Sequence, residues 1–294
     1  MPTTQLRIGL VTGAGGQLGR ALTARTPAGW RCVACDSAAL DVTQADQVRE
    51  LLAGERPAVV INAAAFTGVD AAESQVERAR AVNAQGAENV ALAAVAVGAR
   101  VIQVSTDFVF DGTRGTPYRP GDTPAPLGGY GRSKLEGERA VLRAESGSLV
   151  VRTAWLYASF GRNFVLTMLR SMRERDALDV VDDQIGTPTW ASGLADALWY
   201  AAARPEIMGI HHWTDAGVAS WYDFAVAIQE EARAAGLLER SIPIRPIPTS
   251  AFPTAAKRPA FSVLDKRESW PVLGGEPPHW RTSLRAMLGE MAHG

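Results

Sequence analysis

The sequence is poor in cysteine and has no long apolar run. Two cysteines among 294 residues are too few for a disulfide framework. No stretch approaches the roughly 20 apolar residues that a membrane-spanning helix needs, and the apolar run near the N-terminus, residues 8–11, is too short for the core of a secretory signal. These absences predict a soluble protein of the cytoplasm.

An excess of either charge is also absent. The 30 Lys and Arg residues nearly balance the 31 Asp and Glu residues, which gives a formal net charge of -1. Proteins that bind polyanions carry a basic excess that neutralises phosphates, so we expect no nucleic-acid partner. With 47% hydrophobic and 21% charged residues, the chain can bury a large core.

Cys32 and Cys35 are spaced as C-x-x-C, which can be redox-active or can supply half of a zinc site. They lie in the segment RCVACD, which is typical of a strand. Residues three apart on a strand face opposite sides of the sheet, and no second Cys/His pair accompanies them. We therefore predict two buried structural thiols and no metal.

Short β-branched runs alternate with helical patterns through the first half of the chain. This alternation predicts right-handed βαβ crossovers and an α/β fold, a doubly wound parallel sheet of the Rossmann type. The expected strands are residues 7–11, 31–35, 58–62, 100–105 and 149–152, and the expected helices are residues 17–25, 44–55, 75–97 and 130–145. Thr43 is expected to cap the second of these helices.

The second half is less regular, and we expect it to mix late elements of the sheet with a smaller α/β lid. Helices are expected near residues 162–174 and 194–203, a strand at 209–213, and a capping box at Ser220-x-x-Asp223. The proline-rich segment 241–254 is expected to be an extended linker or loop. Residues 106–129 are rich in Gly, Pro, Thr and Asp, and a loop of that length is either functional or disordered.

The first expected strand runs directly into a glycine loop. Residues 13–19 read GAGGQLG, which from Gly13 is G-x-x-G-x-x-G. In this pattern one glycine makes the turn, one lets the backbone approach a pyrophosphate, and one packs helix against strand. The following helix presents free N–H groups and a positive dipole end to the phosphates. A strand before and a helix after the motif favour a dinucleotide site.

Asp36, at the end of the second expected strand, bears on the choice of dinucleotide. An acid at this place can bind the adenosine ribose hydroxyls, which favours NAD and repels the 2′-phosphate of NADP. Arg20, just inside the first helix, could attract that phosphate, and Asp36 could instead cap its own turn. The choice between the two nicotinamides stays open.

Tyr130 and Lys134 lie four residues apart at the start of an expected helix, so both project from one face. Hydride attack on a ketone develops negative charge on oxygen, and a phenol can protonate that oxygen. Because tyrosine titrates near 10, we expect the ammonium of Lys134 to lower the pKa of Tyr130. Thr106 and Asp107 end another expected strand, at the edge where open α/β sheets bind ligands, and they could hold a carbonyl and sugar hydroxyls; they are also good turn residues.

Taken together, these segments resemble the dTDP-4-dehydrorhamnose reductase family of the extended short-chain dehydrogenases/reductases. The resemblance runs nearly end to end and rests on segments in the family's order: TGAGGQLG, VVINAAAFTGVDAAE, VNA at residues 82–84, VSTDFVFDG, YGRSKLEGE, VRTAWLYASFGRNFVLTML, VDDQIGTPT and PTSAFPTAAKRP.

The resemblance implies a role for each matching residue. Tyr130 would protonate the C4 oxygen of the sugar, Lys134 would hold the nicotinamide ribose, and Thr106 would supply a hydroxyl. Residues expected at the cofactor are Gly13, Gly16, Gln17, Leu18, Gly19, Asp36, Asp41, Val42, Asn62, Ala63, Ala64 and Ala65, with Tyr130 and Lys134. Residues expected at the substrate are Asp107, Phe108, Trp155, Asn163, Phe164 and Arg258, with Trp155 against the hexose ring and Arg258 at the pyrophosphate.

Two departures from the family pattern stand out. Some members place Mg²⁺ at a dimer interface through glutamates, and Ala21 and Ser192 stand at those positions here, so we expect any homodimer to lack the metal bridge. Phe108 replaces the more usual tyrosine and removes a hydroxyl near the site.

The implied activity is reduction of the C4 ketone of dTDP-4-dehydro-L-rhamnose by NADPH or NADH. Residues 1–153 are expected to form the dinucleotide-binding domain, and residues 154–294 mainly the substrate-binding domain. Two alternatives remain open: a 4-ketoreductase of another dTDP-deoxysugar, including the dihydrostreptose type, and a non-catalytic regulatory subunit of the same fold. The catalytic pair, which such a subunit need not keep, argues against the last.

Overall fold

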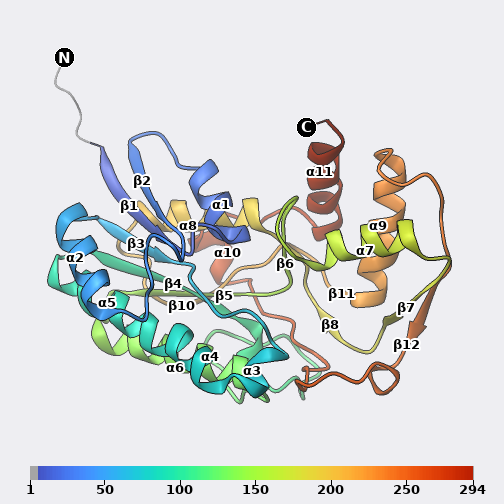
Figure 1. The fold of residues 1–294 in the computed structure, drawn as a ribbon, viewed down its shortest axis with the longest axis horizontal. Helices are drawn as coiled ribbons and strands as arrows, with labels where there is room; N and C mark the ends of the chain where they lie inside the picture. Colours follow the sequence, from blue (N-terminus) through green and yellow to red (C-terminus); the bar gives the residue numbers. More distant parts are fainter. Residues whose placement is uncertain (1–5, 294) are drawn as a thin grey trace.

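The computed structural model describes residues 6–293, and its centre is a parallel sheet (Figure 1). Within these residues six strands pair in the order β10-β5-β4-β3-β1-β2. Their bounds are β1 Arg7–Thr12, β2 Trp30–Cys35, β3 Val59–Asn62, β4 Arg100–Thr106, β5 Leu149–Thr153 and β10 Gly209–His212. The strand order reverses between β1 and β3, so the crevice for a ligand lies at the carboxyl ends of these two strands.

Helices cover both faces of the sheet, which confirms the doubly wound α/β fold. One face carries α1 (Gln17–Ala24) and α8 (Ala191–Ala202), and the other carries α2 (Ala45–Glu55), α5 (Gly86–Ala96) and α6 (Gly129–Ala144). Neighbouring strand residues alternate between the two cores: Val11 and Ile61 pack with α1 and α8, whereas Leu10 and Val60 pack with α2 and α5.

Trp199 of α8 explains the glycine inside the first strand. Its indole N–H donates to the carbonyl of Leu22 at 2.9 Å. A Cβ on Gly9 would lie 2.6 Å from the Trp199 ring. Gly9 therefore lets α8 pack directly onto β1, where any larger side chain would force the tryptophan away.

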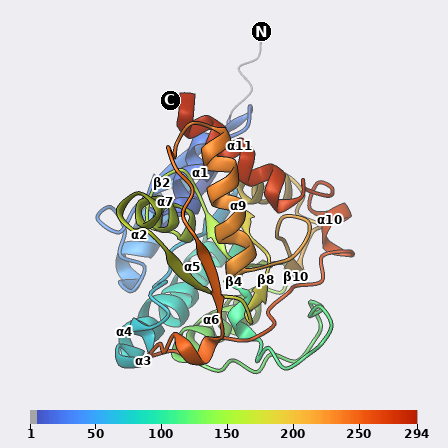
Figure 2. The same ribbon diagram turned by 90° about the vertical axis from the view of Figure 1, so that its right-hand side faces the viewer.

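The second part of the chain builds a lid with a core of its own (Figure 2). Its helices are α7 (Phe164–Glu174), α9 (Trp221–Ala234) and α11 (Trp280–His293), and its strand pairs are β6 (Leu156–Tyr157) with β9 (Thr189–Trp190), β7 (Leu178–Val181) with β12 (Ile244–Ile247), and β8 (Ile185–Gly186) with β11 (Ala219–Ser220). The expected capping box at Ser220 and Asp223 opens α9. Strand β12 corrects the expectation that segment 241–254 is only a linker or loop, because it pairs with β7 along four residues.

One helical expectation is confirmed and one needs correction. The helix expected over 75–97 is a continuous helical run made of α4 (Val76–Arg80), a π-helical turn Ala81–Gln85 and α5, and the short α3 (Ala71–Ser74) precedes it. Thr43 does not cap α2, which begins after Gln44; the Thr43 hydroxyl donates instead to Asp41. Cys35 is buried and Cys32 only half-buried, and the two thiols face opposite cores.

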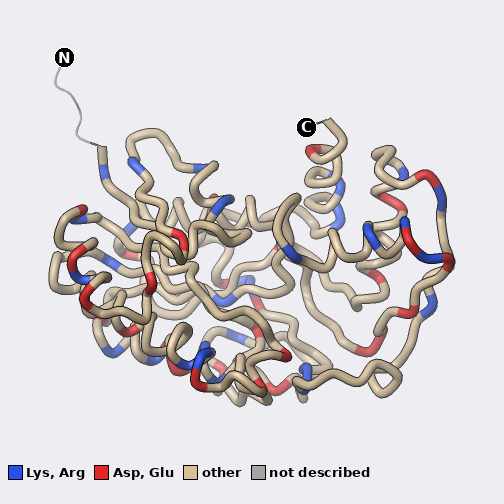
Figure 3. Tube along the Cα trace, viewed as in Figure 1, with Lys and Arg blue, Asp and Glu red and all other residues tan. Residues whose placement is uncertain are grey.

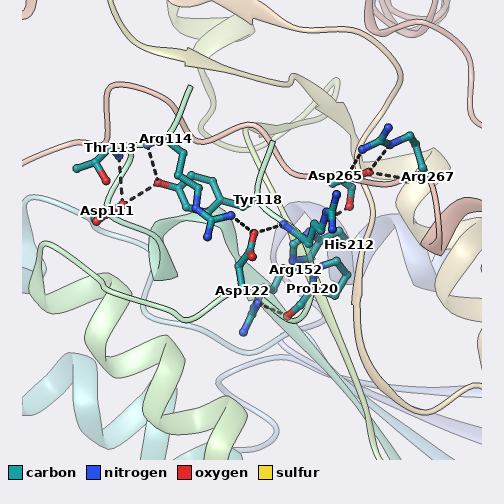
Figure 4. A network of polar contacts seen from close by, with 11 residues as sticks. Asp111, Thr113, Arg114, Tyr118, Pro120, Asp122, Arg152, His212, Asp265 and Arg267 are labelled. Carbon is teal, nitrogen blue, oxygen red and sulfur yellow. Dashed lines mark hydrogen bonds and ion pairs between the residues drawn. The ribbon is translucent and has the colours of Figure 1, made fainter. Parts of the chain in front are cut away.

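The loop after β4 is ordered by polar contacts (Figure 4). It begins with a 3₁₀ turn, Asp107–Val109, and continues to α6. Tyr118 donates its hydroxyl to Asp111 at 2.7 Å, stacks on Phe110 at 4.2 Å, and exchanges backbone hydrogen bonds with Val263 and Asp265. These contacts anchor the loop to the segment that precedes α10 (Ser269–Val272).

Charges of both signs are interspersed over the sheet part and the lid (Figure 3). No helix within residues 6–293 is long and apolar enough to cross a bilayer.

Candidate active site

The glycine loop joins β1 to α1 at the point where the strand order reverses. Gly13 has φ +65°, and a Cβ there would lie 2.7 Å from the backbone of Ala64. A Cβ on Gly19 would lie 2.3 Å from the carbonyl oxygen of Gly13. Both positions therefore exclude larger side chains, while Gly16 is exposed at the start of α1. The loop fits a pyrophosphate, because its backbone can approach the ligand and α1 offers unpaired N–H groups.

Buried polar side chains of β1, β3 and β4 form a chain of hydrogen bonds next to the glycine loop. The Thr12 hydroxyl donates to Asn62, and the Asn62 amide donates to Gln103 at 2.7 Å. The backbone N–H of Ala64 donates to the Thr12 hydroxyl. Asn62 was expected at the cofactor, but its side chain is engaged in joining β1, β3 and β4. Ala63, Ala64 and Ala65 are half-buried beside Gly13.

The other residues expected at the cofactor divide into exposed and buried groups. Asp36 is exposed, and its carboxylate accepts the N–H groups of Ala38 and Ala39, so it does cap its own turn. Asp41 is also exposed, and its carboxylate accepts both the N–H and the hydroxyl of Thr43. The side chains of Leu18 and Val42 are buried in the core, which leaves their backbones for a ligand.

Thr106, Asp107 and Tyr130 meet at the carboxyl end of β4. The Thr106 hydroxyl donates to Asp107 at 3.0 Å and accepts the N–H of Phe108 at 3.2 Å. The Phe108 ring packs edge-on against Tyr130, with ring centroids 5.7 Å apart. Asp107 is 2% exposed, and its second carboxylate oxygen has no hydrogen-bond partner among the described residues. A buried oxygen without a partner is uncommon, and a role in binding a ligand is one explanation.

Burial dominates the titration of the three ionisable groups at this site. It raises the pKa of Asp107 to about 6, and it lowers the pKa of Lys134 to about 8. It also raises the pKa of Tyr130 to about 12, with the charge of Asp107 adding to the rise and a hydrogen bond to Thr106 opposing it. The expectation that Lys134 lowers the pKa of Tyr130 is therefore wrong for the protein without ligands. Desolvation of the phenolate is the larger effect.

Lys134 is held against the sheet. Its ammonium donates to the backbone carbonyl of Val104 at 2.7 Å, and the residue is 3% exposed. Close packing of α6 brings it there, because a Cβ on Gly131 would lie 2.1 Å from the carbonyl of Phe108, and one on Gly137 would lie 2.1 Å from the carbonyl of Asn83.

Three residues that the sequence did not single out, Glu73, Asn83 and Ser133, hold α6 in place. The Glu73 carboxylate accepts the N–H of Gly129 at 2.6 Å, where α6 begins. Asn83, in the π-helical turn, donates to the Ser133 hydroxyl at 3.0 Å, and Ser133 donates to the carbonyl of Tyr130 at 2.9 Å. The VNA segment contains Asn83, but its partners come from elements far away in sequence, so the segment alone could not show this role.

Trp155 lies on the lid side of the site, just after β5. Its indole stacks on Trp221 with ring centroids 3.5 Å apart, and Phe164 packs on the same Trp221 at 4.7 Å. A Cβ on Gly186 would lie 2.5 Å from the indole. Trp155 has φ +46°, which is rare for a bulky residue and is found mostly where function requires the strain. Trp221 was not expected from the sequence.

Three residues singled out in the sequence contact other parts of the protein. Asn163 caps α7 by accepting the N–H of Leu166, and its amide donates to Gln17 at 2.7 Å, so it joins the lid to the glycine loop. Arg258 pairs with Asp70 at 2.7 Å, and its contact with a pyrophosphate stays a prediction. The Arg20 guanidinium lies 4.0 Å from the centroid of the Phe160 ring.

Ala21 and Ser192 stand where some family members carry metal-binding glutamates. Ala21 is buried between α1 and the α8 core, and Ser192 is half-buried at the start of α8.

A glycine loop at the switch point and a Tyr-x-x-x-Lys pair at the start of α6 together define a nicotinamide-dependent oxidoreductase of the short-chain dehydrogenase/reductase class. The family model described as "RmlD substrate binding domain" matches residues 7–293. The chain belongs to this family, that of the dTDP-4-dehydrorhamnose reductases.

Similar proteins cover nearly the whole chain. The dTDP-4-dehydrorhamnose reductase of Aggregatibacter actinomycetemcomitans is 42% identical over 283 residues, which are 94% of this chain and 96% of the relative. That of Streptomyces griseus is 44% identical over 94% of this chain and 91% of the relative. A crystal structure of the Bacillus anthracis enzyme in complex with NADP superposes with a TM-score of 0.91 at 35% identity, and it covers 97% of this chain and 99% of that one.

Proposed function

We propose that this protein reduces the C4 ketone of dTDP-4-dehydro-L-rhamnose to the alcohol of dTDP-L-rhamnose, with NADPH or NADH as hydride donor. The observation that carries the proposal is the meeting of Tyr130, Thr106 and Asp107 beside Lys134 at the carboxyl edge of the sheet, in a chain of this family. Oxidation of NADPH by the purified protein, followed with this keto-sugar and with its C4-reduced product as a control, tests it.

Tyr130, Thr106 and Lys134 have separate roles in the proposed reduction. The dinucleotide, bound across the glycine loop, supplies the hydride. Tyr130 gives its phenolic proton to the C4 oxygen; at neutral pH the proton is present because the pKa is about 12, and transfer is downhill because an alkoxide is a stronger base than a phenolate. With the sugar bound, Thr106 would turn its hydroxyl proton from Asp107 to the same oxygen, and Lys134 would bind a ribose hydroxyl. Solvent then returns the proton to Tyr130.

The lid would hold the sugar and its nucleotide. Trp155, backed by Trp221, offers a flat apolar wall for the hexose, and Phe164 extends this wall. The free oxygen of Asp107 would accept a sugar hydroxyl. We propose the division into residues 1–153 for the dinucleotide and mainly 154–294 for the sugar, with β10 returning to the sheet beside β5. We propose further that the enzyme is cytoplasmic and that any homodimer lacks a metal bridge, since Ala21 and Ser192 offer no carboxylate to a metal.

Asp36→Asn should move cofactor preference towards NADPH. The amide keeps an acceptor for the N–H groups of Ala38 and Ala39 but removes the charge that repels a 2′-phosphate. We expect the wild-type protein to use both cofactors, and the ratio of kcat/KM for NADPH over NADH to rise by about 10-fold in the variant, which is ~1.4 kcal/mol. An unchanged ratio, or a wild-type preference for NADH beyond ~10³, would contradict this view of Asp36.

Trp155→Ala should lower kcat/KM for the keto-sugar by about 10²-fold and leave NADPH affinity nearly unchanged. Loss of the wall misplaces the reacting carbon without touching a catalytic group. Trp199→Ala is the matched control. Trp199 is 3% exposed in the core, and its truncation should cost ~3–5 kcal/mol of stability. Kinetics, NADPH binding and thermal melting are measured on both. A Trp155 variant that melts early but keeps normal activity when folded would leave Trp155 a purely structural residue.

A further inference from the structure

A buried ion pair lies one helical turn beyond Lys134. The Arg152 guanidinium of β5 donates to both carboxylate oxygens of Glu138 in α6, at 2.8 and 2.7 Å. The side chains are 1% and 2% exposed. A pair so completely removed from water contributes little to stability relative to apolar residues of the same volume. Stability alone therefore gives no reason for two charges at this place.

Arg152 is fixed on several sides, and so it fixes Glu138. Its guanidinium also donates to the carbonyl of Pro120 in the loop after β4, and it lies 5.1 Å from the centroid of the Phe110 ring (Figure 4). The bidentate bond leaves the Glu138 carboxylate one orientation. Arg152 of β5 thus links the loop after β4 to the Glu138 carboxylate of α6.

Lys134 lies one turn before Glu138 on α6, and both residues are buried. The two residues are spaced i, i+4, so they share a face of α6. The charged group that acts on Lys134 is Glu138, on its own helix. Asp107 acts on Tyr130 at the start of the same helix, and Arg152 is bound to Glu138. Burial opposes the charge of Lys134, and the charge of Glu138 supports it. The ammonium has one protein acceptor, the carbonyl of Val104.

We propose that Glu138, held by Arg152, is a positioning residue that keeps Lys134 in its charged, ribose-binding form. The catalytic consequence rests on the proposed function, because it assumes that Lys134 holds the ribose during reduction of the sugar. The charge of Lys134 itself can be measured without any substrate.

Glu138→Gln removes the negative charge, keeps the length of the side chain, and leaves the charge of Arg152 in place. Both the loss of the Glu138 charge and the remaining charge of Arg152 disfavour an ammonium nearby, so Lys134 should lose its proton at lower pH. In the wild-type protein the pKa of Lys134 is about 8, and a group that works as the cation is charged below that pH and neutral above it. The alkaline limb of kcat/KM, which reports groups of the free enzyme, should therefore move to lower pH in the variant, with activity recovering as the pH falls.

The chain has only three lysines, Lys134, Lys257 and Lys266, so NMR of protein labelled with ¹³Cε-lysine follows each one. Spectra of the Lys257→Arg and Lys266→Arg variants assign the signals. We expect the titration midpoint of Lys134 to fall by one pH unit or more in Glu138→Gln. The exposed Lys257 should not move, which makes it the internal control. An unchanged Lys134 midpoint would overturn the proposal, whatever the activity.

A second variant covers the case in which Glu138→Gln does not fold, because it leaves Arg152 buried without a partner. Glu138→Gln with Arg152→Met removes both charges, a replacement that folded proteins often tolerate. Its Lys134 midpoint should still lie below the wild-type value, since Glu138 is the charge that favours the ammonium of Lys134. A wild-type midpoint in the double variant would count against the proposal. A wild-type protein that fails to reduce the keto-sugar would refute the proposed function and leave this titration result standing.

Discussion

Tyr130→Phe should lose about 10²–10⁴-fold in kcat and retain its affinity for NADPH. The variant lacks the phenolic proton that the developing alkoxide takes up, a contribution of this size for a general acid. The ring itself stays, so its edge-on contact with Phe108 and the packing of α6 are preserved. Steady-state kinetics and fluorescence titration of NADPH measure the two quantities.

Tyr200→Phe is the matched control for this variant. Tyr200 packs beside Arg204 and Gly274 at the end of α8, and loss of its hydroxyl should leave kcat unchanged. If the Tyr130 variant kept kcat within a few-fold of wild type, another group would have to be the acid.

Lys134→Met should lose turnover to a similar extent and also bind NADPH about 10- to 100-fold more weakly. The weaker binding follows from loss of a charged hydrogen bond to the ribose, worth ~1.5–3 kcal/mol. This combined loss separates Lys134 from Tyr130, whose removal should affect kcat alone. Calorimetric titration with NADPH measures the affinity.

The exposed Lys257 supplies the control, since Lys257→Met should change neither quantity. Thermal melting belongs beside the titration. The charge of Lys134 is desolvated, as its lowered pKa indicates, so its removal should not unfold the protein. A Lys134 variant with unaltered NADPH affinity would show that the ammonium does not touch the cofactor.

The central sheet strands could be predicted because they are mostly apolar runs, and β3 and β5 are buried along their whole length. Residues 58–62 illustrate this, since the pattern alone placed β3 to within one residue. The lid was harder, because pairs such as β8 with β11 are two residues long and their pairing is set by helices packed around them. No local pattern specifies such short strands.

The candidate site divides in the same way. Tyr130 and Lys134 could be found because they are neighbours on one helix. The intramolecular contacts of Asn163 and Arg258 could not, because their partners Gln17 and Asp70 lie 146 and 188 residues away. The pKa of Tyr130 also escaped prediction, because it depends on burial, which the sequence does not reveal.

Hydride transfer to C4 of the sugar is the central claim, and isotope transfer tests it most directly. The purified protein is incubated with dTDP-4-dehydro-L-rhamnose and NADPH that carries deuterium at C4 of the nicotinamide, with each face labelled in separate samples. We predict that one of the two samples yields dTDP-L-rhamnose with deuterium bound to sugar C4, as read by NMR. NADPH that stays unoxidised, or a product without deuterium at C4 from either sample, would contradict the account.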